Sequence, residues 1–261
     1  MGKVTTEAIA LRRTPFGETS QVAEFLTRRE GRLSVIAKGT FRPKSTKGGG
    51  IDLLDVCGLT YVSRSRSRSL PMLVERRVLS HHRGMRTRDD LLTAGLELVE
   101  LLRSLVPEGQ RIPGLYDLAA AYLRALDACP PPSVLPAIVF ALEGGILRMT
   151  GFEPVLDRCV SCERRPTGHT VLRCDPSRGG LLCSACRDGS EDVFDLSAGA
   201  AKTIMATAGR NPESMRDVSL PPAQVRDIRR FYERMLVHVL ERRPRCLYQP
   251  YAETVSEGGV S

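Results

Sequence analysis

The chain has 261 residues, of which 42% are hydrophobic, and it carries a formal net charge of +8 at neutral pH. This length allows a sizeable core and two or three small domains. No apolar run approaches the ~18 residues of a membrane span, and the N-terminus lacks a signal-peptide core, so we expect no membrane association. The eight cysteines do not have the spacing of a disulfide framework, which favours the reducing cytoplasm.

The first third of the chain has the pattern of short β-strands. Five β-rich runs are separated by turn chemistry such as PFGE and REG, or by basic loops. They are TEAIALRRT, SQVAEFLTR, RLSVIAKG, IDLLDVCGLTYVS and LPMLVERRVLS. Five short strands within about eighty residues predict a small β-barrel of the OB type.

The positive charge is concentrated in this third. Residues 1–80 carry 15 Lys and Arg against 7 Asp and Glu, whereas residues 81–261 carry 23 of each. The whole excess of +8 therefore lies in the predicted barrel, as expected of a domain that meets a polyanion. The alternative is a basic surface without a partner.

Two loops of the barrel concentrate this charge further. The first places an aromatic side chain among cations, in the set Lys38, Phe41, Arg42, Lys44 and Lys47. Cations track a phosphate backbone and an aromatic ring stacks on an unpaired base, so we predict DNA binding here, with Arg12 and Arg13 of the first strand. Arg64, Arg66 and Arg68 in the second loop fit a solvated, mobile tip equally well.

From Arg86 the apolar pattern changes to a helical period. Helices are predicted from about Arg86 to Pro107, over 112–128 and 134–151, and later over Ser197–Gly209 and Pro222–Glu241. The polar end of the chain, residues 249–261, is expected to be disordered.

A pair of CxxC motifs lies between the third and fourth predicted helices. Cys159 and Cys162 form the first pair, Cys183 and Cys186 the second, with twenty residues between the pairs. Two such knuckles close a tetrahedral four-sulfur site around one structural Zn²⁺ per chain, with no open position for water. Two disulfides, or four reduced thiols without a metal, are the alternatives.

Cys174 and His169 lie between the two motifs. Cys174 is in the alternating run HTVLRCDP, so we interpret it as a strand residue and not as a ligand. Four well-spaced thiols leave no need for His169. Elsewhere the histidines do not occur at metal-catalytic spacing and no GxSxG motif is present, so we do not predict an enzyme.

The last predicted helix repeats arginine every fourth residue. Arg226, Arg230 and Arg234 share one face, and Phe231 and Met235 lie on a neighbouring face. A solvated basic face is the simpler interpretation. The alternative is a basic rim beside an apolar groove, suited to an acidic peptide with an apolar end.

Together these elements predict a multi-domain α+β fold. It consists of an OB-type barrel that binds DNA (1–80), a helical domain in two parts (81–155 and 193–248), an inserted zinc module (156–192) and the tail (249–261).

Several stretches also resemble a known family. Residues 7–45 contain a PFGE turn and an AKGxxRPKS loop, GLELVELLRSLVPEG forms a long first helix, and TGFEPVLDRCVSC and GGLLCSAC enter and leave the cysteine site. These features, from about Thr6 to about Tyr248, resemble the bacterial recombination mediator and DNA-repair protein RecO. The end of the last helix, ERRPRCLYQPY, departs from the family's pattern.

The resemblance implies a non-enzymatic mediator at the nucleoid, in the cytoplasm. Such a protein binds single- and double-stranded DNA, anneals complementary strands and works with RecR to load RecA onto strands coated by single-stranded DNA-binding protein. It also contacts the acidic, apolar-tipped tail of that coating protein. Two other classes remain open, namely a zinc-ribbon transcriptional regulator and an enzyme with catalytic zinc.

Overall fold

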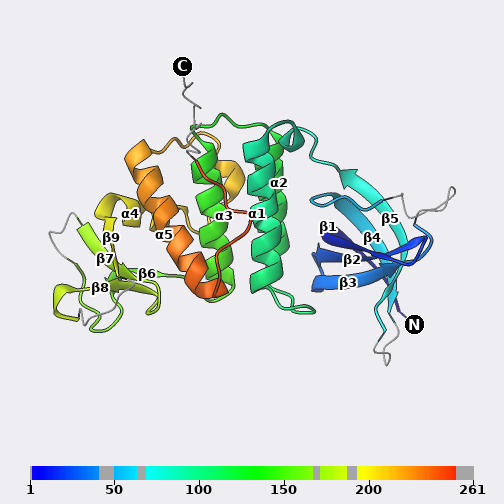
Figure 1. Cartoon of the computed structure of the whole chain (residues 1–261), viewed down its shortest axis with the longest axis horizontal. Helices are drawn as coiled ribbons and strands as arrows, with labels where there is room; N and C mark the ends of the chain where they lie inside the picture. Colours follow the sequence, from blue (N-terminus) through cyan, green and yellow to red (C-terminus); the bar gives the residue numbers. More distant parts are fainter. Residues whose placement is uncertain (1, 41–49, 64–68, 167–170, 187–192, 251–261) are drawn as a thin grey trace, which may run out of the picture.

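The computed structural model describes residues 2–40, 50–63, 69–166, 171–186 and 193–250. The described parts form an elongated molecule, with a β-barrel at one end, helices in the middle and a small sheet at the other end (Figure 1). Within these residues, the longest and most apolar helices fall short of what a membrane crossing requires.

The N-terminal end is a closed five-stranded barrel in the order β1-β2-β3-β5-β4. Closure comes from antiparallel pairing of β1 with β4 and parallel pairing of β3 with β5, which is the strand order of an OB fold. Each of the five predicted runs forms a strand: β1 (Gly2–Phe16), β2 (Ser20–Thr27), β3 (Gly31–Ala37), β4 (Val56–Ser63) and β5 (Met72–Ser80).

Strand β1 is buried on both of its faces. Side chains alternate along a strand, so Ala8 and Ala10 enter the barrel core while Ile9 and Leu11 join the core of the helical body. The pairing of β1 with β2 shifts register between Ala10 and Arg12, where the strand leaves this two-sided contact. One strand therefore joins the two domains.

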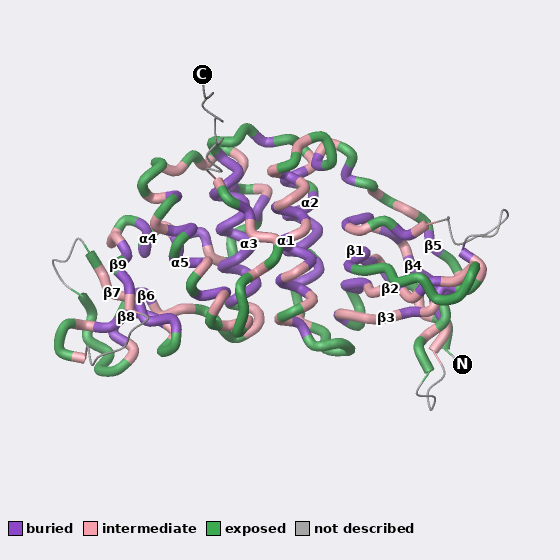
Figure 2. The backbone as a smooth tube through the Cα atoms, viewed as in Figure 1, coloured by how far each residue is buried: buried purple, intermediate pink, exposed green. Residues whose placement is uncertain are grey.

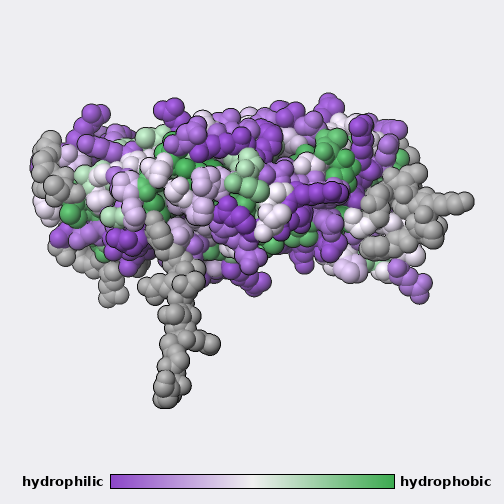
Figure 3. Space-filling model, turned by 90° about the horizontal axis from the view of Figure 1, so that it is seen from above, coloured by the Kyte–Doolittle hydropathy of each residue, from purple (hydrophilic) through white to green (hydrophobic). Residues whose placement is uncertain are grey.

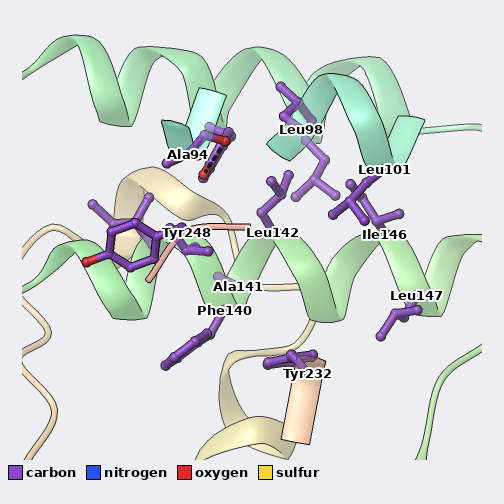
Figure 4. Close-up of a cluster of buried hydrophobic side chains, with 14 of the residues drawn as sticks. Ala94, Leu98, Leu101, Phe140, Ala141, Leu142, Ile146, Leu147, Tyr232 and Tyr248 are labelled. Atoms are coloured by element: carbon purple, nitrogen blue, oxygen red, sulfur yellow. Dashed lines mark hydrogen bonds between the residues drawn. The ribbon is translucent and has the colours of Figure 1, made fainter. Parts of the chain in front are cut away.

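The helical body is built around α3 (Leu135–Met149), whose residues 135–147 are all buried. The remaining helices are α1 (Asp89–Leu105), α2 (Leu115–Asp127), α4 (Ala198–Thr207) and α5 (Pro222–Leu240), with short 3-10 turns at Met85–Thr87 and Pro212–Met215. Figure 4 shows Leu142 and Ile146 of α3 pointing toward Leu98 and Leu101 of α1. On the side of α5, the Phe140 and Tyr232 rings stack with centroids 5.7 Å apart. The tube in Figure 2 is accordingly buried along these helices and inside the barrel.

Polar contacts fix the barrel against the helices. Glu24 of β2 forms an ion pair with Arg32 at 3.1 Å and accepts a hydrogen bond from Nε of Arg103 of α1 at 3.1 Å. Gly31 has φ +74°, and a Cβ there would collide with the Gln110 carbonyl, so glycine is required at this close approach. The orientation of the barrel is therefore defined by packing and by paired charges.

A four-stranded sheet of order β6-β8-β7-β9 forms the other end. Its strands are β6 (Val155–Cys159), β7 (Val171–Asp175), β8 (Gly180–Leu182) and β9 (Phe194–Ser197), with a 3-10 turn at Ser184–Cys186. Cys174, Leu181 and Leu196 of this sheet belong to the main helical core. The small sheet is therefore packed onto the helical body.

The chain beyond α5 forms a strap, residues 241–250, that returns along α1. Glu241 has φ +55° and ends α5. Glu100 of α1 then accepts the backbone N–H groups of Arg245 and Cys246, each at 2.7 Å. Tyr248 is buried, and its N–H donates to Glu97 at 3.0 Å. Residues 251–261, most of the predicted disordered tail, lie outside the described part of the chain.

Candidate metal centre and nucleic-acid interface

The four cysteines of the two CxxC motifs meet at one point. Their sulfurs lie within 4.8 Å of one another, and the Sγ atoms of Cys162 and Cys183 are 3.6 Å apart. In a tetrahedral site with metal–sulfur bonds of about 2.3 Å, neighbouring sulfurs lie about 3.8 Å apart. The arrangement is therefore compatible with a four-thiolate metal site.

Strand pairing brings the two knuckles together. Cys159 ends β6, and Cys183 immediately follows β8, which pairs in parallel with β6. The Val160 N–H donates to the Leu181 carbonyl at 2.8 Å, and the Cys183 N–H points at the Cys159 sulfur at 3.4 Å. The sheet thus places two sequence-distant pairs at hydrogen-bonding distance.

The local electrostatics favour the thiolate forms of Cys159 and Cys183. Burial alone raises the pKa of Cys159, but backbone N–H groups of Cys183, Ser161 and Cys162 bring that pKa down to about 6. Hydrogen bonds from the thiols of Cys162 and Cys186 lower the pKa of Cys183. Hydrogen bonding to Cys162 and Cys183 raises the pKa of Cys186 to about 12, because thiolates crowd around it. A divalent cation is the group that relieves this repulsion.

Cys174 lies outside the cluster. It is on β7, where its side chain is buried in the core, and burial raises its thiol pKa to about 12. A buried, protonated thiol packs as a small apolar side chain. His169 lies outside the described residues.

The barrel carries the predicted DNA-binding residues that the structure describes. Lys38 is exposed directly after β3, and Arg12 and Arg13 are exposed on β1. Arg13 also holds Asp52 at 2.9 Å and the Ile51 carbonyl at 3.0 Å. Outside the described residues lie the predicted site members Phe41, Arg42, Lys44 and Lys47, together with Arg64, Arg66 and Arg68 of the second loop.

The arginines of α5 separate by environment. Arg226, Arg230 and Arg234 are exposed on one face, as the four-residue spacing predicts. The guanidinium groups of Arg234 and Arg230 lie over the Phe194 ring, 5.0 Å and 6.0 Å from its centroid. The aromatic ring therefore orients two of the three cations.

Phe231 does not contribute to the apolar groove that was expected beside this face. Phe231 has no exposed surface, because its ring packs against Phe194 and Tyr232 inside the core, so it is unavailable to a ligand. The cavity at this face has a volume of about 1230 Å³ and lies between α5 and the loops at 151–153 and 176–179. Met235, Arg230 and Arg234 line it, but Arg226 and Phe231 do not.

Sequence reasoning missed two further contributors to this cavity. Phe152, 44% exposed, supplies the apolar wall, and Arg178 of the turn after β7 adds a cation. Phe152 follows α3 in the motif that leads to the cysteines. This place in the sequence indicated that Phe152 lies near the cysteines. Nothing in the neighbouring sequence indicates that α5 packs against the same loop.

Comparison with known proteins agrees with this architecture. The model described as "Recombination protein O N terminal" matches residues 1–80, and "Recombination protein O C terminal" matches residues 89–247. The chain belongs to the RecO family. The N-terminal RecO model spans the barrel, and the C-terminal model spans the helices, the cysteine cluster and most of the strap.

Similar proteins named "DNA repair protein RecO" cover nearly the same length. The protein of Anaeromyxobacter sp. (strain K) is 31% identical over 246 residues, which is 93% of this chain and 94% of that protein. The Desulforudis audaxviator protein is 29% identical, covering 95% of this chain and 96% of its own. That of Rhodopirellula baltica is 27% identical, with 94% and 97% covered. RecO-family membership therefore extends to the whole architecture.

Proposed function

We propose that this protein is a non-enzymatic recombination mediator in DNA repair. The observation that carries the proposal is family membership over the whole chain, together with a basic OB-type barrel at residues 1–80. Around this barrel we place the helical domain (81–155 and 193–248), with the module at 156–192 inserted between its two parts. In this account the protein binds DNA and exchanges partners on it without changing covalent bonds.

DNA binding is assigned to the barrel. Lys38 leaves β3 exposed at the start of the basic loop, in which Arg42, Lys44 and Lys47 accompany Phe41. Cations on such a loop neutralise phosphates, and the aromatic ring stacks on an unpaired base. Arg12 and Arg13 extend the basic surface along β1. Such contacts do not read base edges, so binding is expected to be independent of sequence, on single and double strands.

The cysteine cluster is assigned to one structural Zn²⁺. Cys159, Cys162, Cys183 and Cys186 would hold the ion as four thiolates, which is the donor set that zinc favours in closed sites. When bound, the metal supplies cross-linking energy between two knuckles and not a reactive water. The residues around it place the small sheet beside α5, where it forms one wall of the cavity described above.

The partners follow from the family. We infer that the protein works with RecR to load RecA onto single strands coated by single-stranded DNA-binding protein, and that it anneals complementary strands. The acidic, apolar-tipped tail of the coating protein needs cations beside an apolar surface.

The cavity between α5 and the small sheet supports this tail assignment. Arg230 and Arg234 offer cations held over Phe194, and Phe152 offers the exposed apolar surface, while Met235, 2% exposed, lines the wall beside it. We therefore revise the site to these four residues. Arg226, which does not line the cavity, becomes a natural control.

Annealing of complementary oligonucleotides tests the proposal. Purified protein without any nucleotide should accelerate duplex formation, and both strands should be recovered at their original length. Failure to accelerate annealing would refute the mediator assignment. Binding confined to one duplex sequence would instead identify a transcriptional regulator.

A further inference from the structure

A second basic surface lies where the barrel meets the helical body. It is a groove of about 470 Å³ between β1, the C-terminal half of α1 and the strap. Its cationic lining consists of Arg12, Arg13, Arg103, Arg242 and Arg245. One carboxylate, Glu100, lines it with them. The groove therefore has a marked excess of positive charge.

Ion pairing within the described residues leaves part of this charge uncompensated. Arg13 pairs with Asp52 at 2.9 Å, Arg103 with Glu24 at 3.1 Å, and Arg242 with Glu100 at 2.6 Å. The guanidinium groups of Arg12 and Arg245 make no such ion pair with the part of the chain that the structure describes. Two exposed arginines from opposite walls thus remain available to an anion.

The wall formed by the strap is held in place. Burial raises the pKa of Glu100, but the backbone N–H groups of Arg245 and Cys246 and the Arg242 guanidinium outweigh burial and lower that pKa. Arg242 also donates to the Ser104 hydroxyl at 3.1 Å. Since Glu100 stays ionised with several donors, the strap positions its arginines before any ligand arrives.

The shape of the groove favours a phosphate backbone over an acidic peptide. A peptide needs an exposed apolar anchor, yet among the apolar side chains of this groove Leu11 at 1% and Val99 at 7% exposed are buried, and Leu53 and Leu96 are partly buried against the helical core. The cavity beside α5 differs, because Phe152 is 44% exposed there. Guanidinium groups bind phosphate oxygens as planar forks and need no such anchor.

The groove is continuous with the basic surface of the barrel, and this continuity indicates which anion the groove binds. Arg12 and Arg13 lie on β1 of the basic barrel and also line the groove. We propose that this groove binds the phosphate backbone of DNA, so that a strand held by the barrel continues over α1 to the strap. The inference rests on the proposed function, because it extends the barrel's DNA contact onto the helical body.

Neutralising the strap tests the proposal in the full-length chain. Arg245→Gln and the double change Arg242→Gln/Arg245→Gln remove strap cations and leave the barrel unaltered. The matched control, Arg158→Gln/Arg210→Gln, removes two exposed arginines that do not line the groove. Thermal unfolding of each variant verifies the fold. Fluorescence anisotropy then measures the affinity for oligothymidylates of about 6 and about 30 nucleotides over a salt series, since one OB fold covers about 4–16 nucleotides.

We expect the long oligonucleotide to bind more weakly to the strap variants, with a salt slope smaller by up to about 1.4 for the double change. The short oligonucleotide and the control variant should show little change, and Arg245→Lys should retain the wild-type slope.

Unchanged binding of the long strand would overturn the groove assignment. If Ala substitutions at Lys38, Arg42 and Lys44 weaken DNA binding in that case, the proposed function stands. If they also have no effect, barrel binding falls as well. Loss of binding to an acidic, apolar-ended peptide with unchanged DNA affinity would likewise overturn the inference.

Discussion

Glu143 of α3 and Arg229 of α5 form an ion pair of 2.5 Å inside the helical body, with side-chain exposures of 0% and 5%. Glu97 of α1 lies 3.9 Å from the same guanidinium and is also fully buried. Two carboxylates therefore share one buried cation. Arg229 also donates to the Tyr248 carbonyl at 3.4 Å, so the cluster connects three helices and the strap.

Removing the buried cation should lower the free energy of unfolding far more than neutralising one acidic side chain. Arg229→Met leaves the buried Glu143 carboxylate without its ion-pair partner, and breaking a buried pair in this way costs about 3–5 kcal/mol. The free energy of unfolding, measured by urea denaturation, should fall by that amount. Arg226→Met, at an exposed position of the same helix, serves as the control and should be close to neutral. Equal stability of the two variants would contradict this account.

The cluster also predicts a pH dependence. Burial, followed by the charge of Glu143, raises the pKa of Glu97 well above its usual value, whereas Arg229 opposes this shift. A raised folded-state pKa means that stability is fully present below the unfolded pKa of about 4.3 and declines as pH rises toward the folded pKa.

Glu97→Gln imitates the protonated acid, and its carbonyl still accepts the Tyr248 N–H. The variant should therefore gain stability relative to wild type as the pH is raised from about 4 to 8. Denaturation of both proteins across this range provides the measurement. A stability difference that does not vary with pH would show that Glu97 does not retain its proton in the folded state.

The proposed metal centre predicts different outcomes for substitutions at three cysteines. Elemental analysis should find one zinc per chain, and Cys159→Ser or Cys183→Ser should lose the metal and the order of the small sheet. Cys174→Ser is the matched control, because its side chain is buried outside the cluster. If Cys174→Ser emptied the site while Cys183→Ser retained the metal, the ligand assignment would be wrong.

If the barrel binds DNA through phosphates, loss of its basic side chains should weaken the affinity equally for all DNA sequences. Lys38→Ala with Arg42→Ala and Lys44→Ala should weaken single-strand binding similarly for all sequences. The slope of log K against log salt should fall by roughly 0.7 for each lost phosphate contact. A loss restricted to particular sequences would indicate base readout and contradict the assignment.

The tail site predicts a contrast among three arginines. Arg230→Ala and Arg234→Ala should each weaken binding of a peptide from the coating protein's tail in calorimetry, whereas Arg226→Ala should not, because Arg226 lies outside the cavity. Phe152→Ser should weaken binding through loss of the apolar surface. Equal effects at all three arginines would point to diffuse attraction by the basic face of α5.

The element order could be predicted from the sequence because local signals agreed with the fold. Turn residues separate the five strands, and the apolar periodicity marks five helices. The CxxC spacing indicated a metal site without knowledge of the sheet. These features depend on neighbours within about 20 residues, where sequence patterns are most informative.

Tertiary contacts explain what could not be predicted. Arg226, Arg229, Arg230 and Arg234 look equivalent along α5, but Arg229 faces two carboxylates contributed by α1 and α3. Phe231 was expected beside a groove and is instead covered by Phe194 of the small sheet. The run ERRPRCLYQPY was expected only to depart from the family's pattern, because its return along α1 depends on the distant Glu100. Figure 3 shows hydrophilic side chains mixed with hydrophobic ones over the face in view.

Annealing of complementary strands that are first coated with single-stranded DNA-binding protein is the decisive measurement of the proposed mediator role. The wild-type protein should convert coated strands to duplex faster than coated strands anneal alone. The Lys38, Arg42 and Lys44 alanine variant and the Arg230/Arg234 alanine variant should both be slower, while Arg226→Ala should match wild type. Acceleration that is identical in all variants, or absent in wild type, would contradict a mediator that acts through the basic barrel and the α5 cavity.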